Sequence, residues 1–311
     1  MTSVPVAPRG IDPLNTVMGV RTLSMNASGA RFEQSVGPQF HDHRGLTTLG
    51  SVGVVADDAV AGAFYASVPP GSRTVVSQLT ATAAAPLPAV GAVTAAASTT
   101  HLDLDAGTGI TVGDIRDPHG RVAALLRARS FVVSRPSRVE LHYGPAAELV
   151  VPEPEVVTAA DVLAAMPGLA ILEAMAAGSV RRGPLAGLVD LTVDAATRGT
   201  VTARMTPQAW MSNEIGTVQG GVLLAVADLA SGLAAQTLTE PGDTFRTLDA
   251  HLDLVRSPAV DGPPIRVESE VVRAGRRLAL IETRLTGADG HLLVSARASA
   301  QLGQPFGGAG R

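Results

Sequence analysis

The 311-residue sequence contains no cysteine and few aromatic or charged residues. The lack of cysteine excludes disulfides, thiol catalysis and thiolate metal sites. Aromatic residues make up 3% of the chain and charged residues 17%, so alanine and valine supply much of the core. The N-terminal segment, MTSVPVAPRGIDP, lacks the apolar stretch of a signal peptide, and we therefore expect a cytoplasmic protein.

The sequence also lacks a strong excess of positive charge and a long apolar run that could cross a membrane. A net charge of −4 and a pI near 6.0 argue against nucleic acid as a partner. Residues 77–100 are uncharged, but Pro86 and Pro88 interrupt them, so strands are predicted there rather than a membrane span. The run His41-Asp42-His43 has no third partner in the sequence, and no metal site is predicted.

The two halves of the chain align on each other at one constant offset. Residues with special roles coincide at this offset: Gly29 with Gly199, Gly50 with Gly220, Asp58 with Asp228, and Ser77 with Thr247. Such a coincidence of glycines and acids indicates two copies of one domain in a single chain. Gly29 and Gly199 each mark the turn of a predicted two-stranded hairpin.

The repeat sets the predicted boundaries. Residues 1–16 are expected to be a flexible arm, 17–143 the first copy, 144–158 a linker rich in Pro and acidic residues, 159–303 the second copy, and 304–311 a tail. Alternation of apolar and polar residues predicts strands at 201–205, 247–255, 265–273, 278–286 and 292–300. Residues 159–177 are predicted to be helical, with a break at Pro167. A long helix wrapped by an antiparallel sheet is an α+β fold.

The most informative segment is 213–232, NEIGTVQGGVLLAVADLASG. Gly220 and Gly221 open an apolar run with helical character, and Asp228 lies inside that run. A helix N-terminus offers free backbone N–H groups and a positive dipole end, which can bind an oxyanion or polarise a carbonyl group. Glycine lets a substrate approach this backbone closely. An aspartate in an apolar helix needs a polar partner.

This pattern resembles the signature of the PaaI-like acyl-CoA thioesterases, which have the hotdog fold. In that family an Asn leads, His-Gly-Gly opens the central helix, and an acidic residue follows nine residues after the His. Asn213, Gly220, Gly221 and Asp228 fit this pattern, whereas Gln219 stands at the position of the His. Residues 244–258 resemble the Thr-bearing strand of the family, and residues 271–300 resemble its last two strands. The resemblance covers about residues 160–303.

The resemblance implies two tandem hotdog domains and hydrolysis of an acyl-CoA to free acid and coenzyme A. Coenzyme A enters only as part of the substrate, and no separate cofactor is expected. Hotdog domains pair by extending their sheets, so the two copies are expected to pair within the chain. Association of two such chains into a homodimer is also expected.

Two sites between the copies follow from helix geometry. Gly220 and Asp228 are eight residues apart, about 12 Å along one helix, so they cannot act on the same thioester carbon. The first site combines Asn213, Gln219, Gly220 and Gly221 with Asp58 and Ser77. The second site combines His43, Leu49 and Gly50 with Asp228 and Thr247. We predict activity at the first site, which has the complete set of donors. A shift of one residue in the alignment would exchange Asp58 with Asp57.

The predicted chemistry is thioester hydrolysis. The Gly220 N–H would stabilise the oxyanion, and the aspartate would activate water or attack the thioester directly. Ser77 or Thr247 would place the water, and Asn213 would fix the helix start or the acyl group. Gln219 can donate a hydrogen bond but cannot transfer a proton. The CoA phosphates would bind a cationic group of four residues: Arg256, Arg273, Arg276 and Arg277.

Two other functions remain open for the same fold. Gln219 in place of His and the degenerate motif of the first copy favour a non-catalytic acyl-CoA-binding protein. A hotdog dehydratase is the third possibility, but residues 213–221 contain no His, which counts against it. The fold does not decide between these functions.

Overall fold

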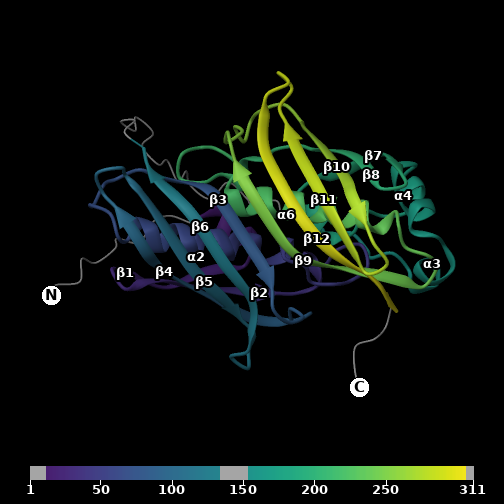
Figure 1. The fold of residues 1–311 in the computed structure, drawn as a ribbon, viewed down its shortest axis with the longest axis horizontal. Helices are drawn as coiled ribbons and strands as arrows, with labels where there is room; N and C mark the ends of the chain where they lie inside the picture. The colour runs from purple at the N-terminus through teal and green to yellow at the C-terminus, as the bar shows by residue number, and fades with distance from the viewer. Residues whose placement is uncertain (1–11, 134–152, 306–311) are drawn as a thin grey trace.

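A single antiparallel sheet of 12 strands runs through both copies in the computed structural model, which describes residues 12–133 and 153–305. The strand order is β1-β2-β4-β5-β6-β3-β9-β12-β11-β10-β8-β7. The first copy forms one half of this sheet and the second copy the other half (Figure 1). Each copy wraps its half around one long helix, as the sequence predicted.

The elements of the two copies follow the same order along the chain. The first copy contains α1 (Pro13–Val17), β1 (Val20–Asn26), β2 (Gly29–Val36), the 3-10 turns η1 (Pro38–Phe40) and η2 (Gly50–Val52), α2 (Gly53–Tyr65), β3 (Thr74–Ala83), β4 (Gly91–Asp103), β5 (Thr108–Arg116) and β6 (Val122–Val132). The second copy contains α3 (Ala160–Ala165), α4 (Gly168–Ala176), α5 (Pro184–Leu188), β7 (Leu191–Thr197), β8 (Thr200–Met205), η3 (Ala209–Met211), α6 (Gly220–Gln236), β9 (Asp243–Leu254), β10 (Ile265–Ala274), β11 (Leu278–Thr286) and β12 (Leu292–Pro305).

The local predictions agree with these elements. The five predicted strands fall within β8 to β12, and the predicted helix at 159–177 is divided at Pro167 into α3 and α4. Proline cannot donate the backbone hydrogen bond of a helix interior, so the chain restarts the helix after it. Gly29 and Gly199 have φ angles of 138° and 84°, conformations that favour glycine in the two hairpin turns.

The predicted boundaries need correction near the N-terminus. Residues 1–11 of the predicted arm lie outside the described residues, but residues 12–16 are not part of a flexible arm. Asp12 caps α1, and Leu14 is only 3% exposed because it packs into the core. Within the predicted linker, residues 144–152 are also outside the described residues, whereas the Thr158 N–H donates to the His43 carbonyl oxygen at 2.7 Å. Of the predicted tail, residues 304 and 305 belong to β12 and residues 306–311 lie outside the described part.

The two copies are joined where β3 pairs with β9 in antiparallel register. Leu79 lies opposite Leu252 in this pair, and both are fully buried. Two side-chain hydrogen bonds cross the same seam, from Gln78 to Asp253 at 2.8 Å and between Thr80 and the His251 ring at 2.7 Å. The seam therefore gives the two halves one continuous apolar core.

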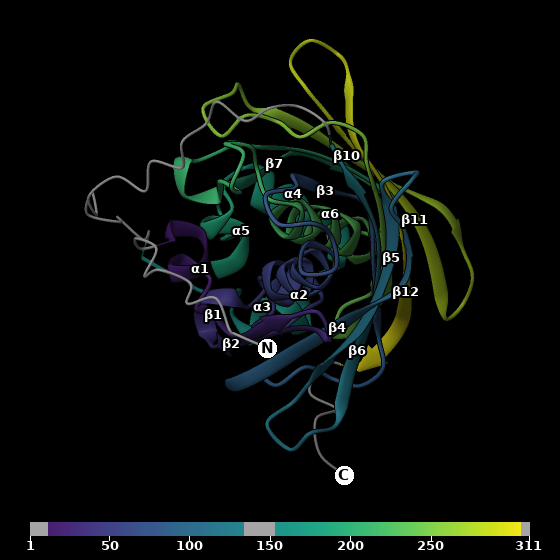
Figure 2. The same ribbon diagram turned by 90° about the vertical axis from the view of Figure 1, so that its left-hand side faces the viewer.

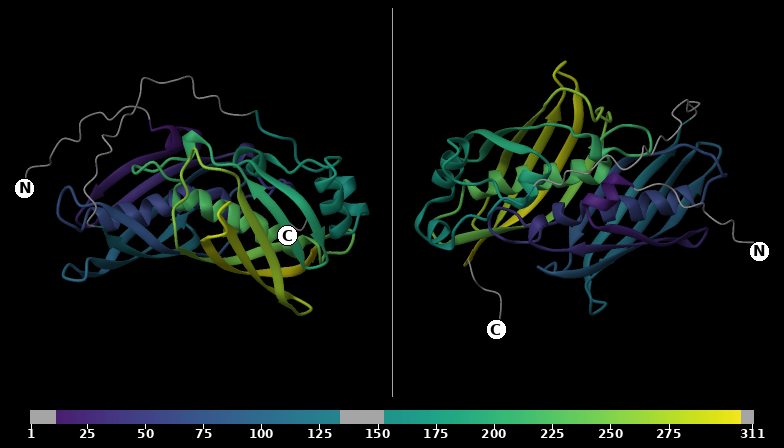
Figure 3. Two further views of the ribbon diagram at one scale, coloured as in Figure 1. Left: turned by 90° about the horizontal axis from the view of Figure 1, so that it is seen from above. Right: turned by 180° about the vertical axis from the view of Figure 1, so that it is seen from behind.

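The sheet curves around α2 and α6, and the short helices cover the side of these two helices that the sheet does not cover. Seen from the end, the two long helices lie inside the curve, with α1 and α5 on the opposite side (Figure 2). The views from above and behind show the same arrangement (Figure 3). Every residue of α6 from Gly221 to Gln236 is buried. Within residues 12–133 and 153–305, no helix is both long enough and apolar enough to cross a membrane.

The first turns of α2 and α6 touch through glycine. A side chain on Gly53 would collide with the Gly221 carbonyl oxygen, and a side chain on Gly221 would collide with the Gly53 carbonyl oxygen. Only glycine permits this approach of two helix backbones. Each helix therefore begins against the first turns of the other.

We predict that Leu252→Ala lowers the free energy of unfolding by about 3 kcal/mol, because it leaves a cavity at the buried seam. The exposed Leu280, which is 46% exposed on β11, provides the control. Leu280→Ala should change the stability by less than about 0.5 kcal/mol. Urea unfolding followed by circular dichroism measures both. Equal effects of the two substitutions would show that the seam is not part of the stabilising core.

Candidate active site

The strand bulges correct the internal alignment by one residue. Two bulges occur in both copies. The extra residue of the first bulge is Leu23 in β1 and Asp194 in β7. The extra residue of the second bulge is Ser77 in β3 and Leu248 in β9. In each pair the two residues are one position further apart in the sequence than Gly50 and Gly220, which the predicted offset had aligned. The predicted offset holds only later, for the bulge residues Ala123 of β6 and Leu293 of β12. Loops of unequal length between the strands absorb the difference.

The shift changes which side chains are equivalent in the two sites. The equivalent pairs are Asp42 and Asn213, Thr48 and Gln219, Gly50 and Gly221, Asp57 and Asp228, and Val76 and Thr247. Asp57, and not Asp58, is therefore the counterpart of Asp228. Ser77 is not the counterpart of Thr247, and its hydroxyl donates instead to the Arg129 carbonyl oxygen at 3.1 Å.

The first site joins the start of α6 to the acidic pair of α2. The Gly221 N–H donates to Asp57 Oδ2 at 3.1 Å and to Gln219 Oε1 at 2.8 Å. Gln219 Nε2 donates to Asp58 Oδ1 at 3.1 Å. The structure thus brings Gln219 and Gly221 to the acidic pair, with Asp57 rather than Asp58 on the amide, whereas the predicted Ser77 lies outside this group. Gly220 also packs closely against this carboxylate. A Cβ atom on Gly220 would lie 2.9 Å from Asp57 Oδ2.

Burial makes the acids of the first site hard to ionise. Desolvation raises the pKa of Asp57 to about 6, against hydrogen bonds from Gly221 and Gly220. The pKa of Asp58 is raised well above its ordinary range, first by burial and then by the neighbouring charges of Asp57 and Asp12. Because the pKa values of both adjacent carboxyl groups are raised, we expect this pair to retain a proton near neutral pH.

The second site is formed by Asp228 of α6 and the turn that precedes α2. The Gly50 N–H donates to Asp228 Oδ2 at 2.8 Å, and the Asp228 residue is only 2% exposed. Burial raises the pKa of Asp228, while the nearby Thr48 hydroxyl, the Gly50 N–H and the nearby Thr247 hydroxyl lower it. Asp228 Oδ1 has no hydrogen bond of normal length and angle among the described residues. Oδ1 can therefore accept a hydrogen bond from a water molecule placed beside the Thr48 and Thr247 hydroxyls.

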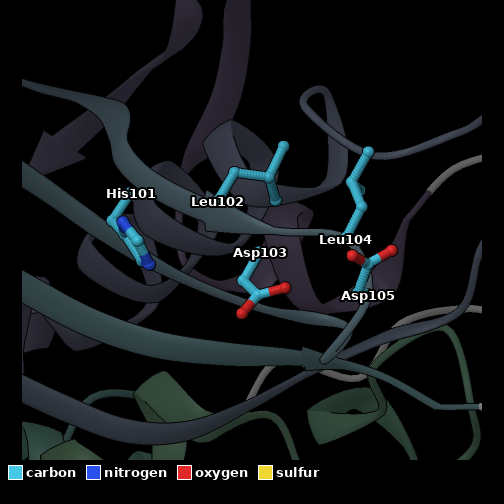
Figure 4. A pocket seen from close by; sticks show the side chains of 5 residues that line it. All are labelled: His101, Leu102, Asp103, Leu104 and Asp105. Atoms are coloured by element: carbon cyan, nitrogen blue, oxygen red, sulfur yellow. The ribbon is translucent and has the colours of Figure 1, made fainter.

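A small cavity adjoins Asp228. Thr48, Asp228 and Thr247 line it together with the apolar residues Leu229, Leu233 and Phe245, and its remaining lining includes the polar and charged side chains of Asp42, His43, Arg44 and Arg182. The space open to the centre of a water molecule is about 20 Å³, which is enough for one water. A larger hollow lies at the β4–β5 hairpin, but five consecutive residues of that hairpin form it (Figure 4). The hollow contacts neither site.

Asn213 shapes the loop before α6. Its Oδ1 accepts from the N–H groups of Ile215 and Thr217 at 3.0 and 3.1 Å. Its equivalent, Asp42, accepts from the N–H groups of Arg44 and Leu46 at 2.8 and 3.1 Å. Asn213 thus holds the turn that precedes α6, and its role at the helix start or on the acyl group stays a prediction.

Of the residues predicted for the second site, His43 lines the cavity together with Asp228. Desolvation lowers the pKa of His43 to about 4, so the imidazole is neutral, and Gln236 is one of its neighbours. Leu49 is buried at 2% exposure, and Thr48 occupies the position equivalent to Gln219. Thr48 was missed because the predicted offset placed Leu49 there. The signal that could have found it is the glycine pair Gly45 and Gly216, which share a φ angle of 79° and follow the corrected offset.

The four predicted phosphate-binding arginines do not form one group. Arg273, Arg276 and Arg277 are exposed at the β10–β11 hairpin, whereas Arg256 follows β9. The Leu302 N–H donates to the Arg277 carbonyl oxygen, so this hairpin adjoins the end of β12 that pairs with the start of β9. Arg256 lies at the opposite end of β9, and its assignment to the same group is wrong. In the part of the chain that the structure describes, no three His, Asp or Glu side chains are arranged to hold a metal ion.

Comparison with known proteins supports the fold. Residues 215–294, which include Asp228 and Thr247, match the model of the thioesterase superfamily. No curated protein matches the chain in sequence. A structure of a protein with the hotdog fold from Alicyclobacillus acidocaldarius aligns with a TM-score of 0.57 at 14% identity, over 94% of this chain and 98% of that one. The chain has the double-hotdog fold.

Two further solved structures share this double-hotdog fold. Acyl-CoA thioesterase II TesB2 from Mycobacterium marinum aligns with a TM-score of 0.58 at 14% identity, over 94% of this chain and 98% of that one. The tesB protein of Mycobacterium avium subs paratuberculosis aligns with a TM-score of 0.59 at 11% identity, over 94% of this chain and 100% of that one. The family match is to the superfamily as a whole, so the closer resemblance to PaaI-like enzymes stays a prediction.

We predict that Asp57→Asn stabilises the protein at pH 8 but not at pH 4. The folded-state pKa of about 6 lies above the ordinary 3.8, so ionisation of Asp57 costs the folded state above pH 6. At pH 4 the folded-state carboxyl is protonated and the unfolded one is only partly ionised, so most of the cost has disappeared. The gain at pH 8 should be about 2 kcal/mol in urea unfolding. Asp105→Asn, at an exposed position, is the control and should change neither value. A gain in the free energy of unfolding that is equal at pH 8 and pH 4 would show that ionisation of Asp57 does not destabilise the folded state.

Proposed function

We propose that this chain is an acyl-CoA thioesterase that hydrolyses an acyl-CoA to free acid and coenzyme A at the second site. One observation carries the proposal: Asp228 is anchored by the Gly50 N–H of the other copy and faces a cavity large enough for water. Asp228 also lies in the segment that matches the thioesterase superfamily. The Mycobacterium marinum structure with the same fold bears the name of an acyl-CoA thioesterase.

The anchored carboxylate supports catalysis by a general base. The Gly50 N–H holds Oδ2, which leaves Oδ1 to accept a proton from water placed by the Thr48 and Thr247 hydroxyls. The water oxygen bonds to the thioester carbon and the tetrahedral intermediate collapses with cleavage of the C–S bond. The thiolate of coenzyme A leaves and takes up the proton. Direct attack by Asp228 through an anhydride uses the same geometry.

The second site is favoured over the first, although the motif at the start of α6 pointed to the first. In the first site the Gly221 N–H donates to both Asp57 and Gln219, whereas the Gly50 N–H of the second site donates to the Asp228 carboxylate. The Gly220 N–H also faces Asp57. Val76 stands at the position equivalent to Thr247, so the first site lacks that hydroxyl.

The cationic hairpin suits coenzyme A bound at the second site. Arg273, Arg276 and Arg277 are exposed at the end of the sheet where β9 begins, and Thr247 lies near that start. We propose that these three side chains bind the CoA phosphates. Assembly of two chains into a homodimer stays a prediction.

A non-catalytic acyl-CoA-binding protein is the second candidate. The N–H groups of both Gly50 and Gly221 already donate to carboxylates, so neither helix start offers an obvious oxyanion donor. Gln219 in place of the family's His points in the same direction. Turnover of acyl-CoA decides between the two functions.

Asp228→Asn should lower kcat by at least about 100-fold, because an amide cannot act as a base. The assay is release of coenzyme A from an acyl-CoA panel, followed with a thiol reagent. Asp57→Asn, the matched change at the equivalent position, should leave kcat within about threefold of the wild type, since it stands outside the proposed site. Activity should also fall as the pH drops through the raised pKa of Asp228.

Other results would contradict the proposal in distinct ways. Loss of activity in Asp57→Asn or Asp58→Asn, with Asp228→Asn still active, would move the reaction to the first site. No turnover by the wild type, with acyl-CoA still raising its melting temperature, would identify a binding protein.

A further inference from the structure

One aromatic ring lines the second-site cavity. Phe245 lies on β9 two residues before Thr247, and it is 3% exposed. A Cβ atom on Gly232 would lie 3.0 Å from Phe245 Cε2, so the ring packs directly against the backbone of α6. Both residues line the cavity.

Arg44 packs over the face of this ring. Its guanidinium carbon lies 3.5 Å from the centroid of the Phe245 ring, and Nη1 donates to the Phe245 carbonyl oxygen at 2.6 Å. Nη1 also donates to Thr244 Oγ1 at 2.9 Å. A buried ion pair with Asp42 at 2.5 Å neutralises the charge of Arg44. The ring is therefore clamped between α6 and a residue that is itself fixed.

The distance from the carboxylate to this ring limits the acyl group. Phe245 precedes Thr247 by two residues of a strand, which is about 7 Å. Gly232 follows Asp228 by one turn of helix, which is about 6 Å. An extended acyl chain that starts beside Asp228 and Thr247 would therefore reach the ring within about four carbons. The cavity on this path has space for about one water, so a longer chain has no room before the ring.

We infer that Phe245, clamped by Arg44 against Gly232, sets the upper length of the acyl group, so that the second site takes short-chain acyl thioesters. This inference rests on the proposed function and adds the substrate class. The ring belongs to this site alone, because the equivalent residue in the first copy is Thr74.

The test is the chain-length profile of kcat/KM for saturated acyl-CoA substrates from acetyl to decanoyl. For the wild type we expect the highest values up to butyryl-CoA and a fall of about 100-fold by octanoyl-CoA. Phe245→Ala should raise kcat/KM for octanoyl-CoA at least about 10-fold and lower it for acetyl-CoA. Phe245→Leu, which removes less volume, should shift the profile less and provides a variant that retains the core. Phe32→Ala removes a buried ring of the first copy and should keep the wild-type profile.

An unchanged profile in folded Phe245→Ala or Phe245→Leu, or a wild-type preference for octanoyl or longer chains, would overturn the inference. Failure of the proposed function gives a different result, namely no hydrolysis of any chain length. In that case the Kd values of the same acyl-CoA series still test the inference. Binding that weakens beyond butyryl in the wild type, and recovers in Phe245→Ala, would support the ring as the stop, and a Kd that does not depend on chain length in either protein would reject it.

Discussion

The contact between Gly53 and Gly221 is the constraint on which both sites depend. Because neither residue has a side chain, the first turns of α2 and α6 approach until their backbones touch. This approach carries Asp57 to the amide of Gly221 and Asp228 to the amide of Gly50. The continuous sheet across β3 and β9 holds the two copies in this relation. A carboxylate on one helix thus meets the N-terminus of the other.

The two sites share this frame and differ in what surrounds it. Around Asp57 the neighbours are a second acid, Gln219 and the residues of α1, so the site is crowded and retains protons. Around Asp228 they are hydroxyl groups, a water-sized cavity and an apolar wall. Divergence after duplication explains such a pair, because one helix contact supports both sites while only one needs to bind substrate.

Much of the fold could be predicted from sequence, since alternation of residues and the special glycines report local structure directly. The break at Pro167 and the strands of the second copy are examples. The site was harder to predict because it depends on register. Asp57 and Asp58 are adjacent, and a one-residue error in the repeat exchanges them and replaces Thr48 by Leu49. Pocket space, the clamp of Arg44 on Phe245 and the separation of Arg256 from the other arginines depend on tertiary packing, which the residue pattern does not encode.

The most direct measurement is a crystal structure with a non-hydrolysable acyl-CoA analogue, in which a ketone replaces the thioester. We expect its carbonyl carbon to lie within reach of Asp228 and Thr247, with the short acyl group directed toward Phe245. The CoA phosphates should lie at the β10–β11 hairpin. Binding of the carbonyl beside Asp57 and Gln219, with the cavity at Asp228 unoccupied, would contradict the assignment of the active site.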